Sequence, residues 1–206
     1  MKINSYNFGP IDTNSYLLID DNKNAVLIDA PPYSFEPINK ICNDEEINLL
    51  AILLTHSHWD HSADSIDFQS KMNVPIYINE LDEYRMLDPI GNALWKLPFD
   101  IKPCKADKYF VDNEVLKFGD ITLKVIFTPG HTQGGTSLYD EKNKVLFSGD
   151  TLFNLGIGRT DLPGGDYPTL RHSINEVLYK LPDSTVVYPG HGDATNIGYE
   201  KHHNRI

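Results

Sequence analysis

The stretch LLTHSHWDHS, residues 53–62, follows an apolar run and contains His56, His58, Asp60 and His61 within six positions. Side chains of an extended segment alternate in direction, so His56 and His58 are expected to point to the same side. Asp60 and His61 are adjacent, and a turn into a helix starting near Ser62 is expected to let both face a second centre close to the first. Neutral imidazoles and carboxylates suit zinc, iron or manganese. The stretch therefore predicts a metal site.

Three more residues of the same ligand type follow apolar runs further along the chain. His131 comes after VIFTPG, Asp150 after KVLFSG and His191 after TVVYPG, so a glycine directly precedes each of them. A strand supplies a rigid base, and glycine permits the tight turn that aims the next side chain. These endings predict a site built at the ends of neighbouring strands, to which all seven residues contribute.

Composition limits the class of protein. A chain of 206 residues is long enough for one sizeable domain. The net charge of −11 argues against nucleic acid as a partner, because phosphate contacts need a basic face. No apolar run reaches membrane-spanning length, the start of the chain does not resemble a signal peptide, and the two cysteines have no metal or redox spacing. We therefore expect a cytoplasmic protein with reduced thiols and a small-molecule substrate. No feature of the sequence indicates an oligomeric state.

The apolar patterns predict strands and helices in two runs. Two strands flank the polar turn at residues 21–24 and form a hairpin, and a further strand covers 48–55. Helices are expected over 34–45, 62–72 and, most strongly, 166–181. The apolar face of that last helix comprises Leu170, Ile174, Val177, Leu178 and Leu181. Two runs of strands with helices inserted predict one α/β domain over residues 1–206, with two sheets packed together and covered by helices.

The motif THSHWDH at 55–61, followed by His131, Asp150 and His191, resembles the metallo-β-lactamase superfamily. The resemblance implies a four-layer αβ/βα sandwich with a two-metal site at one edge. It also implies a role for each ligand. The first metal is held by His56, His58 and His131, the second by Asp60, His61 and His191, and Asp150 bridges both.

Three segments narrow the resemblance to glyoxalase II and its relatives, which hydrolyse S-acylglutathione thioesters. They are FTPGHTQGGTSLY (127–139), LFSGDTLF (146–153) and YPGHGDATNIG (188–198). The best-known metallo-β-lactamases carry cysteine at the position of Asp150, and flavodiiron proteins carry glutamate at that of His58. The resemblance implies two divalent ions, zinc first with iron or manganese as alternatives. We therefore expect a hydroxide bridging the two ions to attack the acyl carbonyl, with Asp60, which orients it, and Asp150 as the catalytic residues.

The segment GIGRTDLPGGD at 156–166 leaves the substrate open. It is similar to short bacterial glyoxalase-II-like hydrolases, and also to persulfide dioxygenases, which bind one iron through the equivalents of His56, His131 and Asp150. Arg159 is expected either to grip a substrate carboxylate or to pair with Asp161 or Asp166. The thiol that carries the acyl group in the thioester substrate is glutathione or another thiol. A nuclease or phosphodiesterase and a metal-binding module without catalysis are the remaining alternatives.

Overall fold

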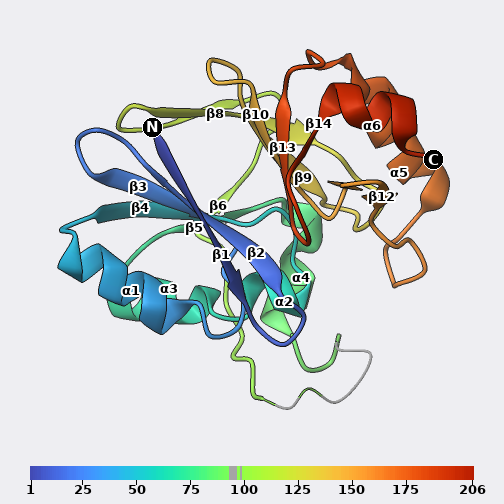
Figure 1. Ribbon diagram of the computed structural model, residues 1–206. Coiled ribbons are helices and arrows are strands. Elements are labelled where there is room, and N and C mark those ends of the chain that lie inside the picture. Colours follow the sequence, from blue (N-terminus) through green and yellow to red (C-terminus); the bar gives the residue numbers. More distant parts are fainter. Residues whose placement is uncertain (93–96, 98) are drawn as a thin grey trace. The chain divides into compact units, whose positions relative to one another are not determined.

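The computed structural model describes residues 1–92, 97 and 99–206 of the chain. The chain divides into two compact units, each with one six-stranded sheet (Figure 1). The first unit comprises Met1–Tyr109 and Lys117–Ile121, and the second comprises Phe110–Leu116 and Thr122–Ile206. The single domain expected over the whole chain stays a prediction.

The sheet of the first unit has the strand order β1-β2-β3-β4-β5-β6. Its strands are β1 (Lys2–Phe8), β2 (Thr13–Ile19), β3 (Asn24–Ile28), β4 (Asn48–Leu53), β5 (Ile76–Ile78) and β6 (Lys108–Tyr109). The β1–β2 and β2–β3 pairs are antiparallel, and β3 through β6 run parallel. The predicted hairpin is confirmed as β2–β3. Parallel strands need crossover connections, so β3 leads through a helix to β4 and β4 through helices to β5.

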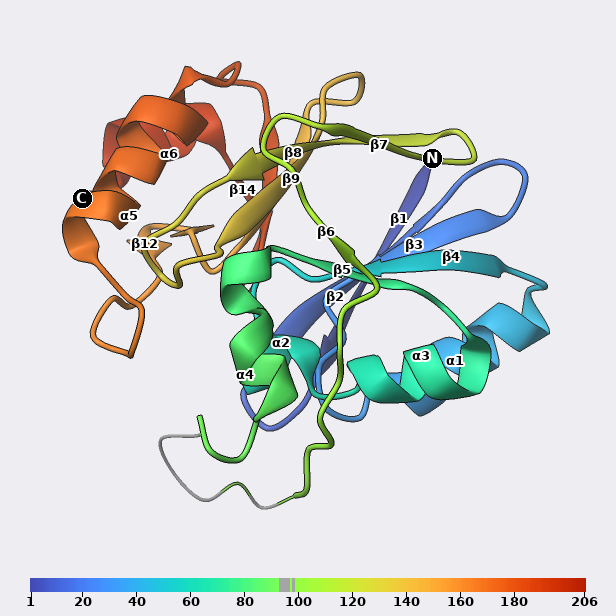
Figure 2. The same ribbon diagram turned by 180° about the vertical axis from the view of Figure 1, so that it is seen from behind.

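The helices of the first unit are α1 (Phe35–Asp44), α2 (Trp59–Ser62), α3 (Ser65–Met72), η1 (Glu80–Asp82) and α4 (Glu83–Leu87). In both views α1 and α3 lie side by side along one face of the sheet (Figures 1 and 2). The rings of Phe35 and Phe68 meet there edge to face, with centroids 5.1 Å apart. Together with buried residues of the strands they form the core of this unit.

The predicted helix over 34–45 is confirmed, whereas the start expected for the next helix is wrong. Helical structure begins at Trp59, so α2 already contains Asp60 and His61, and it is interrupted before α3. At the interruption, Asp64 makes hydrogen bonds to two residues that are distant in the chain. Its N–H donates to the carbonyl of Ala30 (3.1 Å), and its carboxylate accepts the N–H of Phe35 (2.9 Å) at the start of α1.

The sheet of the second unit has the order β14-β13-β10-β9-β8-β7, and a two-stranded sheet pairs β11 with β12. The strands are β7 (Val115–Phe118), β8 (Ile121–Phe127), β9 (Thr136–Asp140), β10 (Val145–Gly149), β11 (Leu152–Phe153), β12 (Gly156–Ile157), β13 (Val186–Pro189) and β14 (Thr195–Asn196). The β10–β13 pair is parallel, and the neighbouring pairs β8–β9, β9–β10 and β13–β14 are antiparallel.

The helices of the second unit are α5 (Tyr167–His172), the π-helical turn η2 (Ser173–Val177), the 3-10 turn η3 (Leu178–Lys180) and α6 (Ile197–His203). Residues 166–181 are therefore helical nearly throughout, but not as one α-helix. At Ser173, where the α-helix gives way to the π-helical turn, the side-chain Oγ donates to the carbonyl of Pro129 (2.7 Å). The apolar face is confirmed, because Leu170, Ile174 and Leu178 are fully buried.

Two further predictions concern the cysteines and membrane-spanning segments. Both cysteines are free thiols and buried, and burial raises the pKa of Cys42 to about 11 and that of Cys104 to about 12. None of the helices in the described part of the chain is long and apolar enough to cross a membrane.

Candidate metal centre

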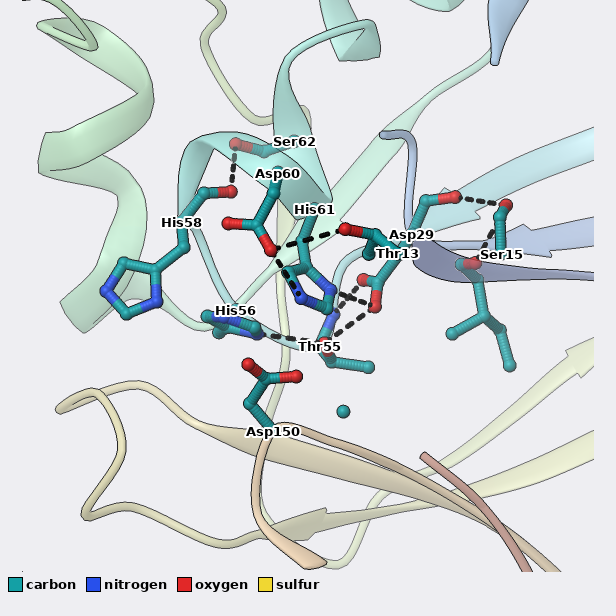
Figure 3. A network of polar contacts seen from close by, with 12 residues as sticks. Thr13, Ser15, Asp29, Thr55, His56, His58, Asp60, His61, Ser62 and Asp150 are labelled. Atoms are coloured by element: carbon teal, nitrogen blue, oxygen red, sulfur yellow. Dashed lines mark hydrogen bonds and ion pairs between the residues drawn. The ribbon is translucent and has the colours of Figure 1, made fainter. Parts of the chain in front are cut away.

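Four side chains gather just beyond β4 in the first unit, and we call them the first ligand set: His56, His58, Asp60 and His61 (Figure 3). A ligand atom of His56 lies within 4.8 Å of one from His58 and of one from His61. His61 Nε2 lies 3.2 Å from Asp60 Oδ2. The helical turn α2 brings Asp60 and His61 inward, where both are buried, while His58 stays half-buried.

The Asp29 carboxylate anchors this set. Asp29 Oδ1 accepts the N–H of Thr55 (2.8 Å), and Oδ2 accepts the Thr55 hydroxyl (2.8 Å) and contacts His61 Nδ1 (2.8 Å) (Figure 3). Asp29 holds a left-handed backbone, with φ of 61°. Backbone strain of this kind is often found at functional sites.

These contacts settle which ring nitrogen carries the proton in two neutral histidines. A carboxylate only accepts, so His61 donates from Nδ1 to Asp29. The Thr55 hydroxyl has a single proton, which goes to Asp29, so at 3.1 Å it accepts from His56 Nδ1. In both rings the lone pair is therefore on Nε2, the atom left for a metal.

The second unit contributes His131, Asp150 and His191, which we call the second ligand set. Asp150 Oδ2 lies 3.5 Å from His131 Nε2 and 3.6 Å from His191 Nε2. His131 Nδ1 donates to the carbonyl oxygen of Arg159 (2.7 Å), and since a carbonyl only accepts, Nε2 again carries the lone pair. The expected position at strand ends is confirmed, because Asp150 directly follows β10, and His131 and His191 follow β8 and β13 within four residues.

The backbone of the Gly-Arg-Thr-Asp segment packs against the second ligand set. A Cβ atom added to Gly158 would lie 1.9 Å from the carbonyl oxygen of Asp150 and 3.0 Å from His131 Nδ1. Only glycine permits so close an approach. The side chain of Arg159 donates from Nε and Nη2 to the two carboxylate oxygens of Asp161, both at 2.7 Å, and this hydrogen bonding lowers the pKa of Asp161 to about 2. The pairing of Arg159 with Asp161 is thereby confirmed.

The donor atoms fit a divalent metal. Two acceptors that both carry lone pairs repel each other, yet His61 Nε2 and Asp60 Oδ2 lie 3.2 Å apart. Two ligands at about 2.0–2.2 Å from one tetrahedral metal are separated by roughly 3.3 Å. The distances between Asp150 and the two histidines of its own set are of the same size. Imidazole and carboxylate suit zinc, iron and manganese, so each ligand set carries part of a metal site.

The seven ligands stay a prediction, and the structure shows which residues contact them. Asp29 and Thr55, with Ser57, are the partners that the sequence suggests for the histidines, and the structure places Asp29 on His61 and Thr55 on His56. The carbonyl of Arg159, the close approach of Gly158 and the contact of Asp82 with Ser57 described below have no sequence signal. Of the remaining histidines, His172, His202 and His203 are exposed, in line with the surface position expected of isolated histidines.

Comparison with known proteins agrees with this geometry. Residues 8–191 match the family model described as "Metallo-beta-lactamase superfamily". The hydroxyacylglutathione hydrolase GloC of Haemophilus influenzae is 37% identical over 93% of this chain and 91% of its own. The probable metallo-hydrolase YqgX of Bacillus subtilis is 36% identical over 99% of this chain and 96% of its own.

Solved structures share the fold. The B3 metallo-β-lactamase BLEG-1 has a TM-score of 0.91 at 38% identity, with 98% of each chain covered. A di-iron form of TTHA1623 has a TM-score of 0.79 at 32% identity, again covering 98% of each chain. ETHE1 from Myxococcus xanthus has a TM-score of 0.82 at 27% identity, covering 99% of this chain and 83% of that one. The predicted fold class, an α/β sandwich, is confirmed.

Proposed function

The chain belongs to the metallo-β-lactamase superfamily as a metallo-hydrolase, and from that membership we propose that it hydrolyses S-acylglutathione-type thioesters. The observation that carries the proposal is the common protonation of His56, His61 and His131. Each donates from Nδ1 to the protein and keeps the Nε2 lone pair for a metal. The likeness to GloC over nearly the whole chain supports the thioester as substrate.

We propose that the two ligand sets act together on two divalent ions, zinc first, with iron or manganese as alternatives. The first ion would be held by His56, His58 and His131, and the second by Asp60, His61 and His191, with Asp150 bridging both. Such ions, when bound, supply a water of lowered pKa and an electrophile for the acyl oxygen. The proposal takes residues 1–206 as one domain.

The chain's own residues orient the reaction. Asp60 accepts from the Thr13 hydroxyl at 3.3 Å, and this hydrogen bond would help to hold its carboxylate in the orientation that positions the nucleophilic water. Asp29 and the carbonyl of Arg159 hold His61 and His131 in the tautomer with the proton on Nδ1, which leaves the Nε2 lone pair of each ring for a metal. The thiol that departs is acidic enough to leave as a thiolate, so the chemistry does not require a strong general acid.

Arg159 is our proposed contact for a substrate carboxylate. The bidentate pair with Asp161 uses Nε and Nη2, and Nη1 is the guanidinium nitrogen outside that pair. Arg159→Lys is expected to raise KM for a carboxylate-bearing thioester several-fold, because an ammonium group cannot reproduce the planar fork. The backbone carbonyl that holds His131 is retained in this variant, so metal content should not change.

The decisive assay follows thioester loss from S-lactoylglutathione by the full chain supplied with zinc, iron or manganese in turn. We expect hydrolysis that a chelator abolishes and added metal restores. Asp150→Ala should lose metal and activity together, whereas Asp183→Ala, which removes an exposed partner of Lys201 in the same unit, should lose neither. Retention of two metals by Asp150→Ala would refute the bridging role.

A second candidate is a single-iron persulfide dioxygenase, favoured by the Gly-Arg-Thr-Asp resemblance and the likeness to ETHE1. It predicts oxygen uptake with glutathione persulfide and no thioester hydrolysis with any of the three metals. The likeness to BLEG-1 makes a β-lactam the natural comparison substrate in the same assay. A cytoplasmic location and a small-molecule substrate complete the proposal, on the acidic composition and the two free thiols.

A further inference from the structure

A buried ion pair lies behind the first ligand set, on the short helical segment formed by η1 and α4. Arg85 Nη1 donates to Asp82 Oδ1 at 3.2 Å, one helical turn apart. The side chain of Asp82 is completely buried and that of Arg85 is 7% exposed. The segment is held at the end of β5 by Asn79, whose side chain accepts the N–H of Leu81 (3.0 Å) and whose carbonyl accepts the N–H of Asp82 (3.0 Å).

The pair contacts the loop that carries the histidines. Asp82 Oδ2 accepts the backbone N–H of Ser57 at 3.1 Å, and Arg85 Nη1 lies 3.5 Å from Ser57 Oγ. Ser57 is the residue between His56 and His58 and is itself buried. The α2 helix that follows the loop also contacts α4, and Figure 2 shows the two helices next to each other.

This arrangement is costly as a source of stability alone. Taking a carboxylate and a guanidinium out of water costs several kcal/mol per ion by general estimates, and apolar side chains of similar volume often stabilise a fold as well or better. What apolar side chains cannot do is accept the N–H of Ser57. That hydrogen bond fixes the peptide plane between the two histidines, and with it the direction in which His56 and His58 leave the backbone.

We propose that Asp82, neutralised by Arg85, is a positioning residue that sets the spacing of His56 and His58 for the metal. The inference rests on the part of the proposed function that makes these histidines metal ligands. It does not depend on which substrate is hydrolysed. Supporting residues of metal ligands typically contribute about 10- to 100-fold to metal affinity.

The test compares Asp82 with Glu83, its neighbour on the same helix. Glu83 is also buried, but its carboxylate accepts the N–H of Ala106 (3.0 Å) and the hydroxyl of Tyr109 (2.6 Å), away from the histidine loop. Asp82→Ala and Glu83→Ala therefore each remove a buried carboxylate. Zinc affinity is measured by competition with a chelator, the ligand field by the absorption of the cobalt-loaded full chain, and stability by Tm.

We expect Asp82→Ala to bind zinc about 10- to 100-fold more weakly and to alter the cobalt spectrum. Glu83→Ala should lower Tm about as much as Asp82→Ala does. Its zinc affinity should stay within twofold of that of the wild type, and its cobalt spectrum should match that of the wild type. Asp82→Asn keeps an acceptor oxygen for Ser57 and should recover most of the zinc affinity while remaining less stable, because Arg85 loses its counter-charge. This rescue would not occur if the carboxylate served stability alone.

The proposal is overturned if Asp82→Ala has the zinc affinity and the cobalt absorption spectrum of the wild type and differs from it only in Tm, as Glu83→Ala does. If Asp82→Ala does not fold, the decision passes to the double variant Asp82→Leu/Arg85→Met, in which apolar side chains replace the ion pair and no acceptor is left for the N–H of Ser57. Wild-type zinc affinity in the folded double variant also overturns the proposal. A wild-type chain that binds no zinc refutes the proposed metal site instead, so the two failures are told apart.

Discussion

His61 Nδ1 and Asp29 Oδ2 lie 2.8 Å apart although 32 positions separate the two residues in the chain. Asp29 directly follows β3, and His61 lies in the helical turn after the neighbouring parallel strand β4, so their contact joins the end of β3 to the first ligand set. The carboxylate keeps the proton on Nδ1 and so leaves the lone pair of Nε2 for a metal.

Asp29→Asn is therefore expected to weaken zinc binding about 10- to 100-fold. Asparagine tolerates the left-handed backbone at this position, so the loss reports the missing charge rather than strain. Asp12→Asn is the matched control, since Asp12 also has a positive φ (54°) but is exposed. A competition titration with a chelator measures both; equal affinities would mean that Asp29 does not set the state of His61.

Removal of metal should lower thermal stability. A ligand that binds only the folded state stabilises it by about 2.7 kcal/mol at a free concentration of 100 times Kd. For a chain of about 200 residues each kcal/mol corresponds to roughly 2–4 °C in Tm, so chelation should lower Tm by about 5–10 °C. Re-addition of zinc should restore it in the wild type and not in Asp150→Ala. An unchanged Tm would contradict metal binding by the folded chain.

Gly130→Ala should destabilise the second unit. The residue precedes His131, has φ of 129°, and a Cβ atom there would lie 2.2 Å from the backbone nitrogen of Leu170 and 2.3 Å from its Cα. Neither backbone atom can move without displacing α5, so we expect a loss of about 3 kcal/mol in the free energy of unfolding, at the upper end for overpacking.

Gly156→Ala serves as the control for this prediction. Its added Cβ would meet only Phe153, at an ordinary 3.7 Å, and its backbone is not left-handed. Alanine at such a position is neutral or stabilising by up to about 1 kcal/mol. Urea unfolding of the two variants at one pH compares them; equal stability would show that α5 does not pack closely on Gly130.

The Arg159–Asp161 pair should contribute stability that depends on pH. The hydrogen bonds from Arg159 hold the pKa of Asp161 at about 2, below its ordinary value of 3.8. Because the folded pKa is the lower one, the contribution is present above about pH 4 and is lost as the pH falls toward 2. The difference in Tm between wild type and Asp161→Asn should therefore shrink between pH 5 and pH 3. The pair is exposed, so the difference is small, and one that grows on acidification would contradict this assignment.

Much of the candidate site could be predicted because its ligands share a local signal. Each follows an apolar run, directly or within a few residues, and an apolar run between turn residues is a strand by its own pattern. The strands β4, β8, β10 and β13 confirm this at His56, His131, Asp150 and His191. The same pattern also predicted the β2–β3 hairpin and α1.

What could not be predicted depends on contacts between distant segments. The interruption between α2 and α3 at Asp64 coincides with hydrogen bonds to Ala30 and Phe35, about thirty positions away. The π-helical turn within 166–181 coincides with the contact of Ser173 with Pro129. In both cases a hydrogen bond to another element overrides local helix propensity, which is a weak preference for any one residue.

By itself the sequence determined the ligand types, their order and their positions after strands, because periodicity and turn chemistry act over a few residues. The tertiary structure alone decided which ring nitrogen of His61 and of His131 carries the proton and how the peptide between His56 and His58 is held. Asp29 orients His61, the carbonyl of Arg159 orients His131, and Asp82 holds the amide between His56 and His58. Those partners are far away in the chain, and a hydrogen bond depends on distance in space, which only the packed fold establishes.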